Sequence, residues 1–172
     1  MSNPINLSKK YFSWISEAKR LEWFPAWWLM RVKVLDLSDN WRHIRILLPL
    51  SWIAKNAGNS MFGGFQASLA DPIAPIACAR IFKGYSVWTR HLSVDFIRPG
   101  NTDLELRFDF PTEKEEEIKQ QLANKGRSTP SFDYGFYTTD GKLCTKITCV
   151  VAIRPEGYST DKKVLTNKRK QV

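Results

Sequence analysis

One stretch of the sequence carries almost no charge, and this stretch constrains the fold more than any other feature. Between Phe62 and Ala79 the only charged side chain is Asp71. Its apolar residues recur at helical spacing: Phe65, Leu69, Ile73, Ile76 and Ala77. A helix that is apolar on nearly all of its surface is normally buried, and this one is interrupted too often to span a membrane. We therefore predict a buried central helix over 62–79.

The segments on both sides of this helix are typical of strands joined by polar turns. Leu104, Leu106 and Phe108 alternate with charged residues, as expected of a strand that has one face exposed to solvent. Asp140-Gly141 is a strong hairpin turn between two further strands. The strands expected in this way are 32–37, 41–48, 88–96, 104–110, 132–138 and 143–153. A chain of 172 residues fits one domain, and we predict an α+β fold with an antiparallel sheet around the central helix.

Two further helices are expected, one before the strands and one between them. The segment 7–29 has an amphipathic pattern that is interrupted at Pro25. Four aromatic residues gather around this interruption, and we expect them to pack the helix onto the sheet: Trp23, Phe24, Trp27 and Trp28. The second helix begins with Thr112 and Glu115, which form a capping box, and ends at Gly126.

The ends of the chain differ in character from its middle. We divide the sequence into an N-terminal helical extension (1–30), a central domain (31–155) and a basic tail (156–172). The net charge of +9 is partly explained by this tail. Such a charge suits nucleic acid, an anionic surface or a phosphorylated ligand such as coenzyme A, and by itself does not select among them.

Cysteine and histidine usage excludes several kinds of site. The three cysteines come with no secretory signal, which predicts free thiols in a cytoplasmic protein. The two histidines and three cysteines lack zinc-ligand spacing, so we predict no metal.

Asp71 is the first candidate for chemistry, because no cation lies three or four residues away on the predicted helix. Burial there would favour the protonated carboxyl, which is how a general base that works near neutrality is made. The alternative is structural. Asp71 precedes Pro72, and an aspartate followed by proline often marks the start of a helix, with the carboxylate as N-cap.

The pair Gly63-Gly64 is the second candidate. Glycines at the start of a buried helix let a substrate approach the backbone, where free N–H groups suit a developing oxyanion. A tight turn into the helix is the equally good alternative. Asp71 lies about two helical turns further along.

These residues belong to a longer segment that resembles a known superfamily. The run Asn56-Ala-Gly-Asn-Ser-Met-Phe-Gly63-Gly64-Phe-Gln-Ala-Ser-Leu-Ala-Asp71 looks like the signature of hotdog-fold thioesterases related to the phenylacetate-pathway enzymes. His91-Leu-Ser-Val-Asp-Phe-Ile-Arg-Pro99-Gly is similar to the strand that follows the central helix there. The resemblance covers roughly 32–153 and is closest to an uncharacterised branch. It implies a hotdog domain that assembles as a homodimer or homotetramer.

The resemblance also implies roles for individual residues in hydrolysis of an acyl-coenzyme A or acyl-carrier-protein thioester. Asp71 is expected to act as general base or nucleophile, the Gly64 N–H to stabilise the oxyanion, and Asn56 to orient water or substrate. We expect further substrate contacts from Phe62, Gly63, Asn59 and Ser68. No cofactor is needed, since coenzyme A is part of the substrate.

Phe62 departs from the pattern of the superfamily, in which many members carry histidine immediately before the two glycines. This difference favours an alternative in which the domain binds acyl-coenzyme A or fatty-acyl groups without turnover. A second alternative is a nucleic-acid or anionic-surface binder, which the charge of +9 and the seven tryptophans would suit. The first interpretation excludes specific nucleic-acid binding and a membrane span.

Overall fold

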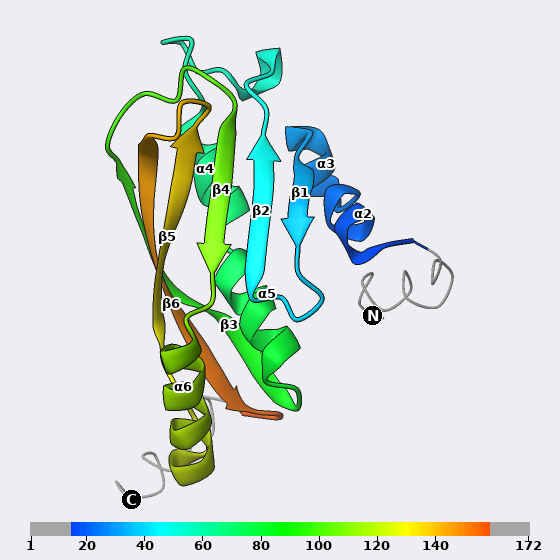
Figure 1. The fold of residues 1–172 in the computed structure, drawn as a ribbon, viewed down its shortest axis with the longest axis vertical. Coiled ribbons are helices and arrows are strands. Elements are labelled where there is room, and N and C mark those ends of the chain that lie inside the picture. Colours follow the sequence, from blue (N-terminus) through cyan, green and yellow to red (C-terminus); the bar gives the residue numbers. More distant parts are fainter. Residues whose placement is uncertain (1–14, 159–172) are drawn as a thin grey trace, which may run out of the picture.

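The computed structural model describes residues 15–158, which form one antiparallel sheet with helices against it (Figure 1). The six strands lie in the order β1-β2-β4-β5-β6-β3. They are β1 (Lys33–Leu37), β2 (His43–Leu48), β3 (Tyr85–Phe96), β4 (Leu104–Asp109), β5 (Ser131–Thr138) and β6 (Leu143–Pro155). Every neighbouring pair is antiparallel. The predicted α+β class and the six predicted strands are confirmed.

The predicted central helix is present, but a break divides it into two. A short 3-10 helix, η1 (Trp52–Ala54), leads toward α4 (Gly63–Ala70), and α5 (Ile73–Ile81) follows after Asp71 and Pro72. Pro72 has no N–H to continue the helical hydrogen bonds. Both residues keep right-handed helical dihedral angles. The two helices therefore continue along the same face of the sheet, behind the strands in Figure 1.

Only one side of this helix pair is buried in the chain. Gln66, Leu69, Ala70, Ile73 and Ala74 face the core, where β4 and β6 contribute further apolar side chains. Three positions along the other side are not buried: Gly64 is half-buried, and Ser68 and Asp71 are exposed. The expectation of a helix buried on all sides is thus wrong, because apolar composition does not reveal how much of a helix one chain can cover.

The N-terminal extension packs less completely than expected. In the described part it forms α2 (Glu17–Glu22) and α3 (Pro25–Met30), with Trp27 and Met30 buried. Trp23, Phe24 and Trp28 are exposed, so the prediction that they pack onto the sheet is wrong. A helix of six residues can direct only one face inward, and that face is used by Trp27 and Met30. The earlier part of the predicted helix, with residues 1–14, lies outside the described residues, as does the basic tail from residue 159.

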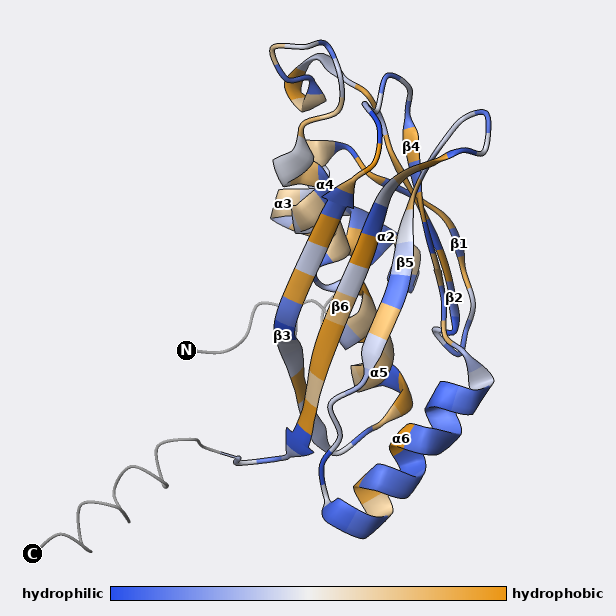
Figure 2. Cartoon of the chain, turned by 90° about the vertical axis from the view of Figure 1, so that its left-hand side faces the viewer, coloured by the Kyte–Doolittle hydropathy of each residue, from blue (hydrophilic) through white to orange (hydrophobic). Residues whose placement is uncertain are grey.

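The helix α6 (Thr112–Lys125) projects beyond one end of the sheet (Figure 1). Its predicted capping box is wrong. Pro111 occupies the N-cap position, and Glu115 instead binds the Arg42 guanidinium through two hydrogen bonds of 2.7 and 2.8 Å. The predicted end is confirmed, since Gly126 closes the helix in the left-handed conformation with φ of 63°. In Figure 2, α6 is predominantly hydrophilic, as expected of a helix that shields only a few core residues.

The three cysteines Cys78, Cys144 and Cys149 are buried and form no disulfide, as predicted. Among residues 15–158, no helix combines the length and apolarity that crossing a bilayer requires.

Candidate active site

The start of α4 presents backbone donors that have no partner. Phe62 is the N-cap residue, and its carbonyl accepts from the N–H groups of Phe65 and Gln66 at 3.1 and 3.4 Å. In the described part of the chain, no acceptor faces the N–H groups of Gly63 and Gly64. Neither glycine has a positive φ, so a left-handed backbone does not explain them. Free N–H groups at a helix N-terminus attract negative charge.

Two aromatic rings cover these glycines. A Cβ placed on Gly63 would lie 2.8 Å from Cζ of Phe96, and one on Gly64 would lie 2.7 Å from Cζ of Phe62. Phe65 meets the Phe62 ring edge-to-face at 5.7 Å. About half of the Phe62 and Phe96 surfaces is nevertheless exposed. The glycines therefore allow close packing, and the mouth above them is apolar. We call the start of α4 with these rings the glycine mouth.

Asp71 ends α4 on the same side of the helix as Gly64. The separation of seven residues corresponds to about two turns, with Ser68 between them. The Asp71 side chain is exposed instead of buried, and it forms no ion pair with any residue in 15–158. It does not cap α5 either, because Pro72 occupies that N-cap without a side-chain hydrogen bond. The expectation that Asp71 is buried and the expectation that it caps a helix are therefore both wrong. Its carboxylate has no ion-pair partner in residues 15–158.

The backbone around Asp71 is held by two residues that sequence reasoning missed. The Thr89 hydroxyl on β3 donates to the Asp71 carbonyl at 3.0 Å. The Tyr134 hydroxyl donates to the Ala70 carbonyl at 2.8 Å. One signal was available. Pro75, four residues after Asp71, has no N–H, so the Asp71 carbonyl needed a donor from outside the helix.

The groups behind Asp71 are kept neutral. Burial raises the pKa of the Tyr134 hydroxyl, and interactions with Cys149 and Asp71 add to the effect. Burial likewise raises the pKa of the Cys149 thiol, with a smaller contribution from Asp71. Burial also raises the pKa of Cys78. Protonated, buried thiols are poor nucleophiles, which leaves the Asp71 carboxylate as the candidate for chemistry at this position.

The loop before α4 uses its own side chains to keep its shape. Asn56 Oδ1 accepts from the Gly58 N–H at 2.9 Å and from the Ser60 N–H at 3.2 Å, and its amide donates to the Ser60 hydroxyl. The Phe62 N–H then donates to the Ala54 carbonyl at 2.7 Å. Asn56 thereby positions the residues that open α4. Asn59 is exposed with φ of 58°, and substrate contacts by these two asparagines stay predictions.

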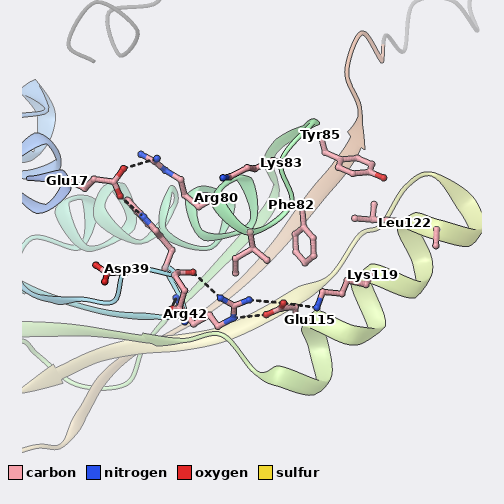
Figure 3. Close-up of a pocket in the computed structure, with 14 residues that line it drawn as sticks. Glu17, Asp39, Arg42, Arg80, Phe82, Lys83, Tyr85, Glu115, Lys119 and Leu122 are labelled. Atoms are coloured by element: carbon pink, nitrogen blue, oxygen red, sulfur yellow. Dashed lines mark hydrogen bonds and ion pairs between the residues drawn. The ribbon is translucent and has the colours of Figure 1, made fainter. Parts of the chain in front are cut away.

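A cleft lies at the other end of the helix pair, at the C-terminal end of α5 (Figure 3). Its volume is about 920 Å³, and its walls are rich in charged residues. The Arg80 guanidinium contacts Glu17 at 2.8 Å and lies over the Trp41 ring at 4.7 Å. Glu115 pairs with Arg42 and, at 3.0 Å, with Lys119. We call this the ion-pair cleft. Its carboxylate–cation pairs neutralise one another. In residues 15–158, no three histidine, cysteine or acidic side chains are placed to hold a metal.

Solved structures of other proteins share this architecture at low sequence identity. No family model matches the sequence, and no curated protein does. A Pseudomonas aeruginosa protein of unknown function, described as a probable thioesterase, superposes with a TM-score of 0.71 and 16% identity, over 91% of this chain and 99% of its own. A Haemophilus influenzae thioesterase gives 0.64 and 15%, over 85% and 96%. The E. coli PaaI protein, from the phenylacetic acid degradation operon, gives 0.58 and 16%, over 81% and 91%.

The chain has the hotdog fold. The expectation drawn from the segment 56–71 is therefore confirmed at the level of the fold. Within this hotdog domain, α4 and α5 form the central helix. Ser68 and Asp71 are exposed on one side of that helix, and the half-buried glycine mouth lies at its start.

Proposed function

We propose that the protein hydrolyses acyl thioesters carried by coenzyme A or by an acyl-carrier protein. One observation carries this proposal: among residues 15–158, the start of α4 has two N–H donors without an acceptor, and Asp71, about two turns further along the same helix, is exposed and has no ion-pair partner. Acyl transfer requires these two functions, a donor for the oxyanion and a base or nucleophile. The likeness of the fold to proteins described as thioesterases supports the choice of substrate.

The reaction follows from these groups. Asp71 removes a proton from water, and the water oxygen attacks the thioester carbonyl carbon. The carbonyl oxygen gains negative charge and accepts hydrogen bonds from the Gly64 and Gly63 N–H groups at the start of α4. Because seven helical residues separate Gly64 from Asp71 by about 10 Å, we propose that these N–H groups come from the second copy of the chain. The intermediate then collapses, the carbon–sulfur bond breaks, and the proton passes from Asp71 to the leaving thiolate. Direct attack by Asp71, followed by hydrolysis of the anhydride, uses the same groups. Only water is consumed, so no cofactor takes part.

A second copy of the chain completes this site in our proposal. The strand β3 has twelve residues and lies at the edge of the sheet, paired only with β6. Long edge strands present unpaired backbone groups that favour pairing with another chain. Thr89 on β3 contacts Asp71 directly, so a partner paired along β3 would cover the exposed stripe at Ser68 and Asp71. Sedimentation velocity should show a dimer or a tetramer, and a monomer at micromolar concentration would contradict this arrangement.

Steady-state hydrolysis across an acyl-coenzyme A series tests the proposal. Release of the free thiol, followed with a thiol reagent, should rise with enzyme concentration and depend on acyl-chain length. The matched measurement is calorimetric binding of the same compounds. Tight binding without thiol release would replace the hydrolase with a non-catalytic acyl-binding module. That alternative has an observation in its favour, since the Phe62 ring lies against Gly64 where the substrate carbonyl must approach.

A further inference from the structure

An apolar surface formed by α3 and the two residues before it has no role in the proposed reaction. Four of its large side chains are exposed, with fractions between 47% and 67%; we call them the α3 patch: Trp23, Phe24, Trp28 and Leu29. Trp27 and Met30, at 3% and 2%, anchor the opposite face of the helix in the core. In Figure 2 the α3 ribbon has an apolar colour. The helix is therefore fixed in place with a second apolar face turned outward.

Pairing of two copies along β3 leaves this patch open. The helix α2, directly before α3, packs against β1. The strands β1 and β3 are opposite edges of the sheet. Dimer formation through β3 therefore places the two α3 patches at the far ends of the assembly, away from the interface.

Cations adjoin the patch. Arg31 ends α3 with a left-handed φ of 57°, and Lys33 begins β1. Arg31 and Lys33 are exposed, and neither forms an ion pair with a residue in 15–158. Lys19 on α2 is also exposed, although it pairs with Glu22. These cations beside the apolar patch favour a partner that is negatively charged at its surface and apolar beneath it.

We propose that the α3 patch docks the protein onto an anionic lipid surface. Tryptophan rings favour the boundary between headgroups and acyl chains, and neighbouring lysine and arginine residues are attracted to anionic lipid. The Trp28 and Leu29 side chains enter this boundary, and Arg31 and Lys33 contact lipid phosphates. The protein lies on the surface, anchored by one short helix and its flanking charges.

Co-sedimentation with vesicles tests the proposal. The full chain should bind phosphatidylcholine vesicles that contain about one-third phosphatidylserine, and added salt should weaken this binding. Trp28→Ser with Leu29→Ser should weaken it about tenfold or more, as should Arg31→Glu with Lys33→Glu. All four positions are exposed, so the melting temperature should not change.

The matched control changes the same charges elsewhere. Lys162→Glu with Lys163→Glu, in the basic tail, should leave vesicle binding within about twofold. Equal loss from the tail variant would mean binding by diffuse charge, and the proposal would be wrong. The proposal would also be wrong if the unmodified chain did not bind these vesicles. If Trp28→Ser with Leu29→Ser instead lowered the oligomeric state in sedimentation velocity, the patch would be an interface between copies of this chain.

Discussion

The two ends of the central helix pair differ in how their polar groups are partnered. In the ion-pair cleft, the carboxylates of Glu17 and Glu115 each contact a cation. At the other end, the N–H groups of Gly63 and Gly64 have no acceptor in residues 15–158, and Asp71 has no ion-pair partner there. Polar groups that serve stability are normally satisfied within the fold. We infer that the large cleft stabilises the domain and that the glycine mouth with Asp71 performs the chemistry.

The comparison shows why cavity size is a poor guide to the site in this protein. The cleft of about 920 Å³ joins α2, the β1–β2 turn, α5 and α6, so its charges hold together elements that are distant in sequence. At the apolar glycine mouth, the Phe62 and Phe96 rings lie over the two glycines. Substitutions at the glycine mouth and at Asp71 should therefore lower activity without lowering stability. Substitutions in the ion-pair cleft should lower stability and leave turnover unchanged.

The largest effect is expected from Asp71→Asn, which should lower thioester hydrolysis by about 10²–10⁴-fold, the range for loss of a general base. Asparagine has almost the same shape as aspartate, and the exposed Asp71 side chain makes no ion pair in residues 15–158. The melting temperature should therefore not change. The control is Asp39→Asn, the same change at an exposed residue in the ion-pair cleft. Its kcat/KM should match that of the unmodified protein. Equal losses from both variants would remove the distinction between the two ends.

Gly64→Ala should have the next largest effect, a loss of about 10–1000-fold in turnover, which is typical of disturbing one oxyanion donor. Stability should be unchanged or higher, because alanine is preferred over glycine in a helix by ~1 kcal/mol. The new methyl group meets the Phe62 ring, so Phe62→Ala provides a control background. A loss that disappears in that background would trace the effect to the displaced ring, and the oxyanion assignment would lose its support.

At the cleft, Arg42→Gln should affect stability and leave turnover per folded molecule unchanged. Glu115, with 7% of its side chain exposed, would keep only Lys119 as a partner, which we expect to cost about 2 kcal/mol in urea unfolding at pH 7. Lys119→Gln is the control. Its side chain is half-exposed and its attraction to Glu115 is screened by water, so this variant should be clearly less destabilised than Arg42→Gln.

The same pair predicts a pH dependence. The hydrogen bonds from Arg42 hold the pKa of Glu115 below its ordinary value, against the effect of burial. A lowered folded-state pKa adds stability above the unfolded pKa of about 4.3, and this stability is lost as the pH falls through the folded value. The stability difference between the unmodified protein and Arg42→Gln should thus be full at pH 7 and shrink on acidification below about pH 4. A constant difference would point to lost packing instead of lost charge.

The smallest effect is expected from Glu17→Gln. Glu17 and Arg80 are each more than one-third exposed, so water screens their attraction, and we expect a cost of about 0.5 kcal/mol in thermal or urea unfolding. The hydrogen bond from the Trp41 indole can be kept by the amide oxygen. A cost above about 2 kcal/mol would show that this pair is coupled to the rest of the cleft.

Local patterns predicted most of the elements correctly. The alternation in 104–110 became β4, and the hairpin at Asp140-Gly141 joins β5 and β6, with Gly141 at φ of 79°. These features depend on residues within a few positions of one another. Glu115 shows where such reasoning fails. Its position suits a capping box, but an arginine 73 residues away competes for the carboxylate and forms a bidentate pair.

The sequence named the residues of the candidate site, whose roles stay predictions, but it did not give their environment. Helical spacing put Asp71 about two turns beyond the two glycines. That Asp71 is open to solvent, with Thr89 and Tyr134 behind the helix break, depends on which strands lie beside the helix. Apolar composition wrongly suggested burial, because it does not show whether the covering surface comes from the same chain.

By itself, the sequence determined the kinds of elements, the turns that join neighbouring strands and the spacing of chemical groups along the central helix. Each of these follows from backbone preferences and periodicity over short distances in the chain. Only the tertiary structure decided the strand order β1-β2-β4-β5-β6-β3, the pairing of Arg42 with Glu115 and the exposure of the α3 patch. These depend on contacts between distant segments, for which many arrangements satisfy the same local pattern and the free energy of packing selects one.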